Sequence, residues 1–462
     1  MHELERLHED LRQRASESVR AILDARLGTV PPPPRPRAFG FNLLRWKRRN
    51  APVVTEASAD REHSVVAQFK ADAQASATPL DRALFGSLHR VLGAVLATRG
   101  RLGSDHAVLA ELATRHVCNR LGSRLIGGVI APLVEVAIET EGYTRVANRA
   151  APLLISLKGA SAAGKSSIRP MVKRLMLDSG IDPDDYATIS PDVWRRLLLD
   201  YDSLGEAYKY AGHLTSRELV VIDAKLDRYI RDKAERGQGI SHLLVDRFRF
   251  DSFSIVEIGR VLRRTYTKYV STIHMYFIVT PPEETVERGW QRALERGRYK
   301  AVEDFLGHCV ETYSGMPRVL FRWLGYRHVD YHFHFLDNRV PKGAFPTPIA
   351  SGDGTRMVIY DPHGIVAIDR YQKIDIHARS RGAVYPPGPA MNTCNNLSFL
   401  RQCLHRIPVV TFFDGPEGKA WLEARNGNFE ILDPSTFEKL LGDQHMAVII
   451  GEIAPGLAAR SR

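Results

Sequence analysis

A glycine-rich loop with the composition of a phosphate-binding site spans Gly159–Ser166 and reads G-A-S-A-A-G-K-S. This string matches the complete Walker A pattern. An apolar run typical of a buried strand, residues 153–157, precedes the loop, and residues 167–176 follow it with the spacing of a helix face. In that context the backbone N–H groups of the loop and the N-terminus of the helix can surround a polyphosphate. The motif therefore predicts an ATP site.

Individual residues of this loop have distinct expected roles. Gly159 and Gly164 let the backbone approach the phosphates closely because neither carries a Cβ. Lys165 is expected to bridge the β- and γ-phosphates, and the hydroxyl of Ser166 to ligate Mg2+. ATP is therefore the expected phosphoryl donor and Mg2+ the expected cofactor. The other predicted ATP-binding residues are Ala160, Ser161, Ala162, Ala163 and Ser167.

A candidate general base follows the second predicted strand, residues 186–189. Ligands of doubly wound sheets lie at the carboxyl ends of the strands. There, Asp192 can accept the proton of a hydroxyl that attacks the γ-phosphate, and Arg195 can clamp a phosphate. Asp192 also fits a helix N-cap after Pro191, and the two roles do not exclude each other. We favour the base, and predict Asp192, Lys165 and Arg195 as the catalytic residues.

A second carboxylate, Asp246, follows the third predicted strand, residues 242–245. It occupies a Walker B-like position, where it can hold Mg2+ through water and complete a metal site with Ser166. The alternative is an ordinary ion pair at the strand end with Arg247 or Arg249.

Four arginines follow the fourth predicted strand: Arg288, Arg292, Arg296 and Arg298. The first three are spaced by four residues and share one helix face, where like charges repel unless an anion lies opposite. This pattern predicts a lid whose guanidinium groups neutralise a transferring phosphoryl group. The alternative is a solvated basic face balanced by Glu284, Glu287 and Glu295.

Two further clusters are candidate binding sites. Tyr208, Lys209 and Tyr210 can form an acceptor-binding wall with rings that stack on a base, and Asp246 and Arg247 join them as predicted substrate-binding residues. In a second cluster, His332 and His334 share one face of a predicted strand. Because no third metal ligand is evident, we interpret them as core or surface histidines rather than a metal pair.

The elements that position these residues indicate an α/β fold. Residues 151–340 alternate strand and helix, which predicts a P-loop kinase core: a parallel sheet with helices on both faces. Residues 77–150 form a helical region. Residues 1–76 are expected to be a mobile arm outside the folded core, with a helix to about residue 30, a polyproline segment at 31–37 and a basic cluster at 45–49. The basic cluster fits a nucleic-acid, membrane-surface or targeting patch, or a solvated linker, which we favour.

Residues 341–462 predict a small α+β extension without a catalytic motif. Its expected hairpin joins residues 357–360 and 365–368 through the turn Asp361-Pro362-His363-Gly364. Strand-like runs follow at 409–413 and 429–432.

Overall composition is that of a globular protein with a core: 44% of the 462 residues are hydrophobic, and the net charge of +11 favours anionic partners. The four cysteines are widely spaced, which predicts reduced, buried thiols and a cytosolic environment. No run of about 20 apolar residues is found, and Leu125–Ile138 is interpreted as pieces of core helix. We therefore expect no membrane span, and see no secretory signal.

These motifs together resemble the zeta-toxin-like P-loop kinases, which share the phosphate loop, an Asp with an Arg three positions on, and an Arg-rich lid. The same positions also resemble polynucleotide 5′-kinases. A closer resemblance is to bacterial type III avirulence effectors with such a kinase domain. It rests on these strings and covers about residues 150–340: L-K-G-A-S-x-x-G-K-S from Leu157, I-S-P-D-x-W-R from Ile189, Y-K-Y-A-G from Tyr208, D-R-F-R-F-D-S-F from Asp246, G-R-Y-K-A-V from Gly297 and Y-S-G-M-P from Tyr313.

The resemblance implies phosphorylation of the 3′-hydroxyl on the adenosine ribose of NAD by ATP and Mg2+, in a toxin or effector. It also implies a small antitoxin-like chaperone and residence in the bacterial cytoplasm, with delivery into a host cell by a type III system. Many zeta toxins instead phosphorylate UDP-N-acetylglucosamine. A polynucleotide 5′-hydroxyl kinase and a nucleotide-switched interaction protein stay open as alternatives, although no nucleic-acid-binding module is recognisable.

Overall fold

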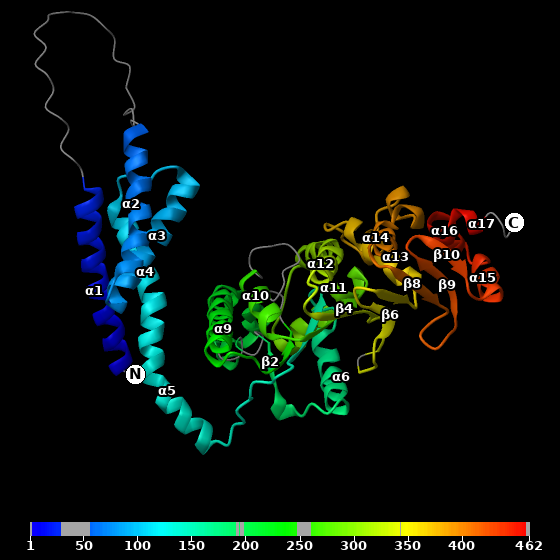
Figure 1. Ribbon diagram of the computed structural model, residues 1–462, viewed down its shortest axis with the longest axis horizontal. Helices are drawn as coiled ribbons and strands as arrows, with labels where there is room; N and C mark the ends of the chain where they lie inside the picture. The colour runs from blue at the N-terminus through cyan, green and yellow to red at the C-terminus, as the bar shows by residue number, and fades with distance from the viewer. Residues whose placement is uncertain are drawn as a thin grey trace, which may run out of the picture. The chain divides into compact units, whose positions relative to one another are not determined.

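The computed structural model describes residues 2–28, 56–190, 194, 198–246, 260–341 and 343–458. The chain divides into two compact units, Met1–Thr144 and Arg145–Arg462. The described part of the first unit is helical, and the second combines one sheet with helices (Figure 1). The polyproline segment 31–37 and the basic cluster 45–49 lie outside the described residues.

The first unit is a helical assembly with its own core. Its helices are α1 (His2–Leu27), α2 (Glu56–Ala75), α3 (Pro79–Arg99), α4 (His106–Val117), the π-helical turn η1 (Cys118–Gly122) and α5 (Ser123–Thr140). On α1 the buried residues Leu11, Ala15, Val19 and Leu23 recur every four positions, which gives the helix one apolar stripe.

That stripe packs in one cluster with residues of α2, α3 and α4, including Val66 and Phe69 of α2. The guanidinium of Arg26 covers the Phe69 ring at 5.0 Å and pairs with Asp72 at 2.5 Å. The prediction that residues 1–76 stay outside the folded core is therefore wrong for α1 and α2. Charged residues of α1 such as Glu5 and Arg20 are exposed, whereas the apolar stripe of the same helix is buried.

Helix α5 contains Leu125–Ile138, which the sequence predicted to be pieces of core helix, but it is not part of the core. None of its residues is buried, and Leu133 and Val136 are more than half exposed, at 66% and 61%. Together α4, η1 and α5 form one helix, His106–Thr140, that is long and apolar enough to cross a membrane by length and composition, and only 11% of its most apolar window is buried. The core of the unit ends at Leu121, so the apolar composition beyond it is not matched by burial.

The described residues of the second unit form a ten-stranded sheet in the order β10-β9-β8-β7-β6-β5-β4-β1-β3-β2. Its strands are β1 (Leu153–Gly159), β2 (Tyr186–Ile189), β3 (His242–Val245), β4 (Thr272–Val279), β5 (Asp330–Asp337), β6 (Thr347–Gly352), β7 (Arg356–Ile359), β8 (Val409–Phe413), β9 (Ala420–Arg425) and β10 (Asn428–Ile431). Strands β2, β3, β1, β4 and β5 are all parallel, which confirms the predicted parallel core sheet.

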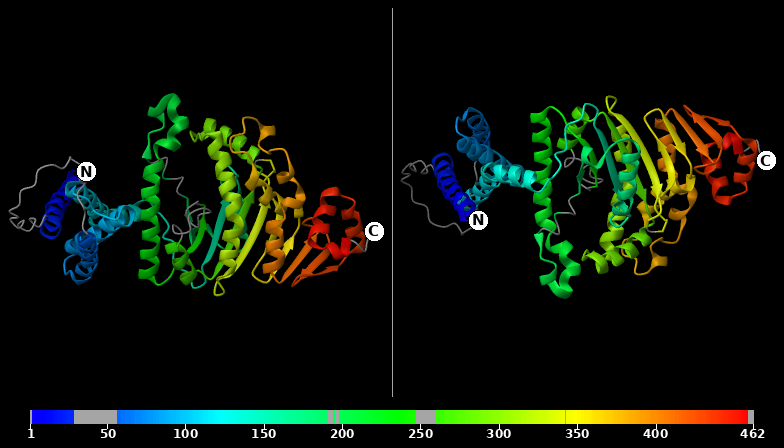
Figure 2. Two further views of the ribbon diagram at one scale, coloured as in Figure 1. Left: turned by 90° about the horizontal axis from the view of Figure 1, so that it is seen from above. Right: turned by 90° about the horizontal axis from the view of Figure 1, so that it is seen from below.

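Helices flank this sheet (Figure 2). They are α6 (Lys165–Asp178), α8 (Ala211–Leu214), α9 (Ser216–Gly237), α10 (Arg260–Tyr269), α11 (Pro282–Arg296), α12 (Val302–Leu324), α13 (Pro362–Arg370), α14 (Ser398–Arg406), α15 (Pro434–Leu441), α16 (Gln444–Ile453) and α17 (Pro455–Ala458). Short 3-10 segments are η2 (Pro183–Asp185), η3 (Asp202–Tyr210), η5 (Tyr371–Lys373), η6 (Arg381–Ala383), η7 (Pro389–Met391) and η8 (Thr393–Asn395).

The residues after β5 continue the same sheet. Strand β6 pairs antiparallel with β5, and β7 to β10 follow in order across the sheet. One hydrophobic cluster runs through the whole unit: Phe399 of α14 lies 5.5 Å from Phe335 of β5 and 6.2 Å from Phe321 of α12, measured between ring centroids. The described residues of 341–462 therefore share a sheet and a core with those of 151–340.

The predicted hairpin at residues 357–368 is wrong in its second half, because residues 365–368 belong to α13. Asp361 caps this helix by accepting a hydrogen bond from the backbone N–H of His363, and Pro362 occupies its first turn. Both are helix-start signals that outweigh the turn interpretation. Strand β7 pairs instead with β6 and β8.

The four cysteines are free thiols. Cys309 and Cys403 are buried, as predicted, whereas Cys118 is partly buried and Cys394 is exposed. Burial raises the pKa of Cys309 to about 11, so this thiol stays protonated.

Candidate nucleotide-binding site

The glycine loop connects β1 to α6 and passes very close to its neighbours. A Cβ on Gly164 would lie 2.1 Å from Nδ2 of Asn338, and one on Gly159 would lie 2.9 Å from the carbonyl oxygen of Ile278. Gly164 also has a φ of +96°, a left-handed conformation that strains side-chain-bearing residues. Both glycines are thus required by contacts that the structure shows.

Lys165 turns its side chain into the loop. Its Nζ donates hydrogen bonds to the carbonyl oxygens of Gly159 and Ala160, both at 2.9 Å. Ser166 is exposed at the first turn of α6. The ammonium group and the hydroxyl therefore lie at the mouth of the loop, where helix N–H groups favour an anion.

A cavity of about 500 Å³ opens beside this loop, a volume typical of small-molecule sites. Three segments line it: the start of α6, one face of α11, and the chain after β5. The lining residues are Ala162, Gly164, Ser166, Ser167, Ile168, Glu287, Arg288, Gln291, Arg292, Glu295, Asn338, Val340, Pro341, Gly343 and Ala344.

Two of the four predicted lid arginines, Arg288 and Arg292, reach this cavity. Arg292 also approaches Ser161, with 3.5 Å between Nη2 and Oγ. The side chain of Arg296 lies outside the described residues, and Arg298 follows the end of α11. Two of the glutamates of the alternative interpretation, Glu287 and Glu295, line the same cavity, so its wall carries both charges.

Asn338, at the end of β5, holds the loop in place and was not predicted. Its Nδ2 donates to the carbonyl of Ala163 at 2.7 Å, and Thr280 Oγ1 donates to the same oxygen at 3.0 Å. Arg288 in turn donates to the carbonyl of Asn338 at 2.8 Å. One chain of hydrogen bonds therefore connects α11, the end of β5 and the phosphate loop. The only sequence signal was the position of Asn338 after a strand.

His308 of α12 is a second unpredicted contact. Its Nδ1 accepts a hydrogen bond from the backbone N–H of Ser161 at 2.8 Å. Burial lowers the pKa of His308 to about 3, with further lowering by the charges of Lys300, Lys165 and Arg292. The ring is therefore neutral at physiological pH, which is the state that leaves Nδ1 free to accept.

The free energy of unfolding should fall at acid pH, in part because of His308. Its folded-state pKa lies below the unfolded value of about 6.5, so unfolding takes up a proton as the pH falls below 6.5, and stability is lost there. We expect His308→Asn, which keeps an acceptor near the position of Nδ1, to reduce the stability lost between pH 7 and pH 5 by about 2 kcal/mol. Urea unfolding at both pH values measures this loss.

The matched control for that measurement is His405→Asn, since His405 is exposed. It should leave the pH dependence as in the wild type. An unchanged pH dependence in His308→Asn would contradict the assigned neutral state.

Asp246 is buried at the end of β3, and its side chain forms an ion pair with Arg169 of α6. An ion pair was the alternative interpretation of Asp246, but with Arg247 or Arg249, which lie outside the described residues. The partner was missed because Arg169 is far away in sequence. The pair ties β3 to the helix that begins at Lys165.

Asp192 and Arg195 also lie outside the described residues. The structure does describe Tyr208, Lys209 and Tyr210, the predicted acceptor wall. They lie against α11, the helix that carries the predicted lid arginines. Tyr208 Oη donates to the carbonyl of Leu294 at 2.7 Å, and the N–H of Tyr299 donates to the carbonyl of Lys209 at 2.7 Å. The ring of Tyr210 meets that of Tyr299 edge-on at 5.6 Å. These contacts join η3 to the end of α11.

The histidine pair of β5 gains a third member from β4. His274 Nδ1 lies 3.2 Å from His334 Nε2, and its ring stacks on that of His332 at 4.7 Å. Burial lowers the pKa of His274 and of His334 to about 4. Within the described part of the chain, no group of three or more His, Cys, Asp or Glu side chains could hold a metal ion.

No protein-family model matches the chain, and no curated protein matches it. A solved structure that it resembles was determined in the molecular and structural characterization of the PezAT chromosomal toxin–antitoxin system of the human pathogen Streptococcus pneumoniae. The two chains are 14% identical over 44% of this chain and 76% of that one, with a TM-score of 0.31.

Proposed function

We propose that this protein is an ATP- and Mg2+-dependent kinase that transfers the γ-phosphate to a ribose hydroxyl of a nucleotide. The supporting observation is one cavity that joins the phosphate loop to Arg288 and Arg292 of α11. A phosphate loop alone serves binding as well as catalysis, but cations on an opposite helix suit the charge of a transferring phosphoryl group.

The residues present fit a magnesium ion. The exposed hydroxyl of Ser166 lies at the mouth of the loop, and Asp246 supplies a carboxylate at the end of the neighbouring strand β3. Both are the hard oxygen ligands that Mg2+ prefers. Ser166 would hold the ion, Asp246 would act through water while its carboxylate also pairs with Arg169, and the ion would neutralise phosphate charge.

The protein's own groups perform the remaining steps. Lys165 and the two lid arginines hold the oxygens of the transferring phosphate, and Arg195 clamps the acceptor side. Asp192 takes the proton of the attacking hydroxyl, which forms the new P–O bond as the bond to ADP breaks. The proposed acceptor-binding residues on η3 are Tyr208, Lys209 and Tyr210, because a hydrogen bond joins η3 to the end of α11. The proposal adds Asp246 and Arg247 to them.

The 3′-hydroxyl of NAD is the acceptor that we favour, and its support is the sequence resemblance to type III effector kinases. UDP-N-acetylglucosamine and polynucleotide 5′ ends are the alternative acceptors, and a nucleotide-switched interaction protein is the alternative outside enzymes. The same resemblance supports an effector or toxin role, a small antitoxin-like chaperone, and delivery from the bacterial cytoplasm into a host cell.

The test is to incubate the protein with ATP, Mg2+ and NAD and to look by mass spectrometry for a product one phosphate heavier than NAD. A product would establish reaction and acceptor together. Its absence with NAD, followed by a product with UDP-sugars or oligonucleotide 5′ ends, would reassign the acceptor. Tight ATP binding without turnover on any acceptor would favour the interaction protein.

Asp192→Asn should keep ATP binding and lower the rate of product formation about 10²-fold or more, because the amide cannot take the proton. ATP affinity and initial rate are measured on the same preparation. A variant with full activity would refute Asp192 as the base, and Asp200→Asn, at an exposed aspartate, is the control.

A further inference from the structure

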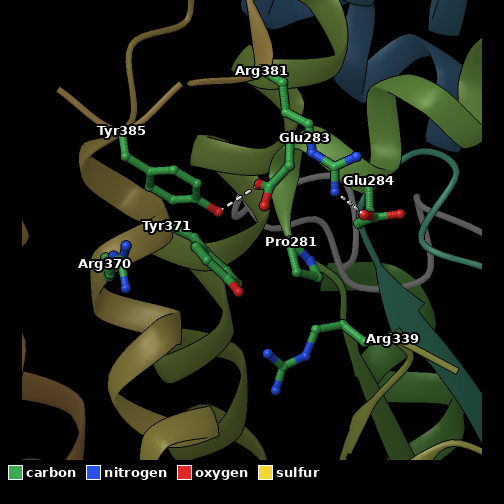
Figure 3. Close-up of a pocket in the computed structure, with 8 residues that line it drawn as sticks. All are labelled: Pro281, Glu283, Glu284, Arg339, Arg370, Tyr371, Arg381 and Tyr385. Atoms are coloured by element: carbon green, nitrogen blue, oxygen red, sulfur yellow. Dashed lines mark hydrogen bonds and ion pairs between the residues drawn. The ribbon is translucent and has the colours of Figure 1, made fainter. Parts of the chain in front are cut away.

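A second cavity, of about 370 Å³, lies at the start of α11 in the second unit. Four segments line it: the start of α11, the chain after β5, the junction of α13 and η5, and the chain around η6 (Figure 3). The lining residues are Pro281, Glu283, Glu284, Arg339, Arg370, Tyr371, Arg381 and Tyr385. None of them lines the nucleotide cavity, so this is a separate site.

Tyr371 directs a hydroxyl into this cavity. The residue as a whole is only 7% exposed, and its hydroxyl makes no hydrogen bond within the described part of the chain. Figure 3 shows the hydroxyl pointing into the space that the Arg339 guanidinium also faces. Burial raises the pKa of Tyr371, so the group is a donor at neutral pH. Because the Tyr371 hydroxyl opens into the cavity and no described protein group accepts its hydrogen, it can donate to a ligand bound there.

The neighbouring charges divide into paired and available groups. Arg381 pairs with Glu284, and Tyr385 Oη donates to Glu283 at 2.6 Å. Arg339 pairs with Asp337, which lies outside the cavity lining, at 2.5 Å. Among the described residues, Arg370 has no carboxylate partner.

Arg370 is held over the ring of Tyr385, with 4.8 Å between its guanidinium carbon and the ring centroid. Figure 3 shows Arg370 on the side of Tyr371 away from its hydroxyl, so the donors that face one space are the Tyr371 hydroxyl and the N–H groups of Arg339 that Asp337 does not use. A guanidinium group with a neutral hydroxyl donor suits the several oxygens of a phosphate.

We propose that this cavity binds a small phosphomonoester. Its phosphate lies on Arg339 and Tyr371. The cavity is larger than a phosphate group, and its opposite wall carries the carboxylate of Glu283, which can accept hydrogen bonds from ligand hydroxyls. A phosphorylated sugar or polyol meets both requirements.

The position of the Tyr371 ring does not depend on its hydroxyl. The ring packs edge-on against Tyr313 of α12, with centroids 5.0 Å apart. Tyr313 is fully buried and exchanges hydrogen bonds with the backbone of Thr280, accepting from its N–H at 2.9 Å. Tyr371→Phe therefore removes one donor and keeps the packing.

The test is calorimetric titration with ribose 5-phosphate on a Lys165→Ala background, which weakens phosphate binding at the glycine loop. We expect binding that Tyr371→Phe and Arg339→Gln each weaken about tenfold or more, since each loses a hydrogen bond to a charged group. Arg425→Gln is the matched control, because Arg425 is an exposed arginine of β9 paired with Glu423, and it should change nothing. Ribose without phosphate should not bind.

Equal affinity with and without the Tyr371 hydroxyl would overturn the proposal, as would the absence of any binding by ribose 5-phosphate. Equal affinity for inorganic phosphate and ribose 5-phosphate would overturn the assignment of a phosphomonoester. Because the background lacks Lys165, these results are independent of the kinase assay. A failure here and a failure of the proposed kinase function are therefore distinguishable.

Discussion

Replacing Lys165 with alanine should lower the rate of phosphoryl transfer from ATP by about 10³-fold or more and leave the protein folded. Nζ of Lys165 lies 2.9 Å from the carbonyl oxygens of Gly159 and Ala160, so its charge is already inside the loop. A single cation that acts on the transferring phosphoryl group is worth about 10³–10⁵ in rate. Lys165 is only partly buried and lies outside the hydrophobic core, so its loss should cost little stability.

The measurement is the initial rate of product formation, with circular dichroism and urea unfolding as checks of the fold. Arg174→Ala is the control, because Arg174 is an exposed cation of the same helix. It should retain the wild-type rate. A Lys165→Ala protein that turns over as fast as the Arg174→Ala protein would show that the loop does not act on the transferred phosphate.

Local sequence was enough for the elements whose own residues determine them. The runs at 153–157, 186–189 and 242–245 are short, apolar and bounded by turns, and each is a strand of the parallel sheet. Residues 365–368 are equally apolar, but the cap at Asp361 and the proline after it start a helix there. Apolar composition shows that a segment can be buried, while caps and neighbours determine its conformation.

Helix α5 shows the same limit for burial itself. Leu133 and Val136 have the composition of core residues but lie exposed, whereas Leu11 and Val19, in the charged N-terminal region, are buried. The spacing of four on α1 contained the signal, because it places the apolar residues on one face. For α5, the sequence did not show whether another element packs against its apolar residues.

The sequence predicted the motif of the candidate site but not the residues that hold the phosphate loop in place. The Walker A string and the spacing of Arg288 and Arg292 place these residues around one cavity. Asn338 and His308 act on the loop from strands and helices distant in sequence, through the carbonyl of Ala163 and the N–H of Ser161. A single asparagine or histidine has no periodicity, so only the folded arrangement identifies it.

The contacts of Asn338 also explain why the loop carries a glycine at position 164. The amide of Asn338 occupies the space beside Gly164 in order to reach Ala163, and Arg288 fixes the backbone of Asn338 from the lid side. The phosphate loop, the end of β5 and the lid helix are therefore packed as one unit. A substitution in the phosphate loop, at the end of β5 or in α11 should therefore change the affinity for ATP.

Gly164→Ala is the sharpest test of that arrangement, and we expect it to cost roughly 3 kcal/mol or more in stability, ATP affinity or both. Two penalties add: the left-handed backbone, at about 1–3 kcal/mol, and the clash of the new Cβ with Nδ2 of Asn338, 2.1 Å away, at about 1–3 kcal/mol. Urea unfolding and ATP titration measure the two effects.

The control is Gly180→Ala, since Gly180 has a φ of +79° and no neighbour within 4 Å of an added Cβ, so it carries only the backbone penalty. Adding Asn338→Ala to Gly164→Ala should restore part of the loss, because it removes the clashing atom and leaves the backbone strain. Equal costs for Gly164→Ala and Gly180→Ala would mean that the contact between Asn338 and the phosphate loop does not constrain the site.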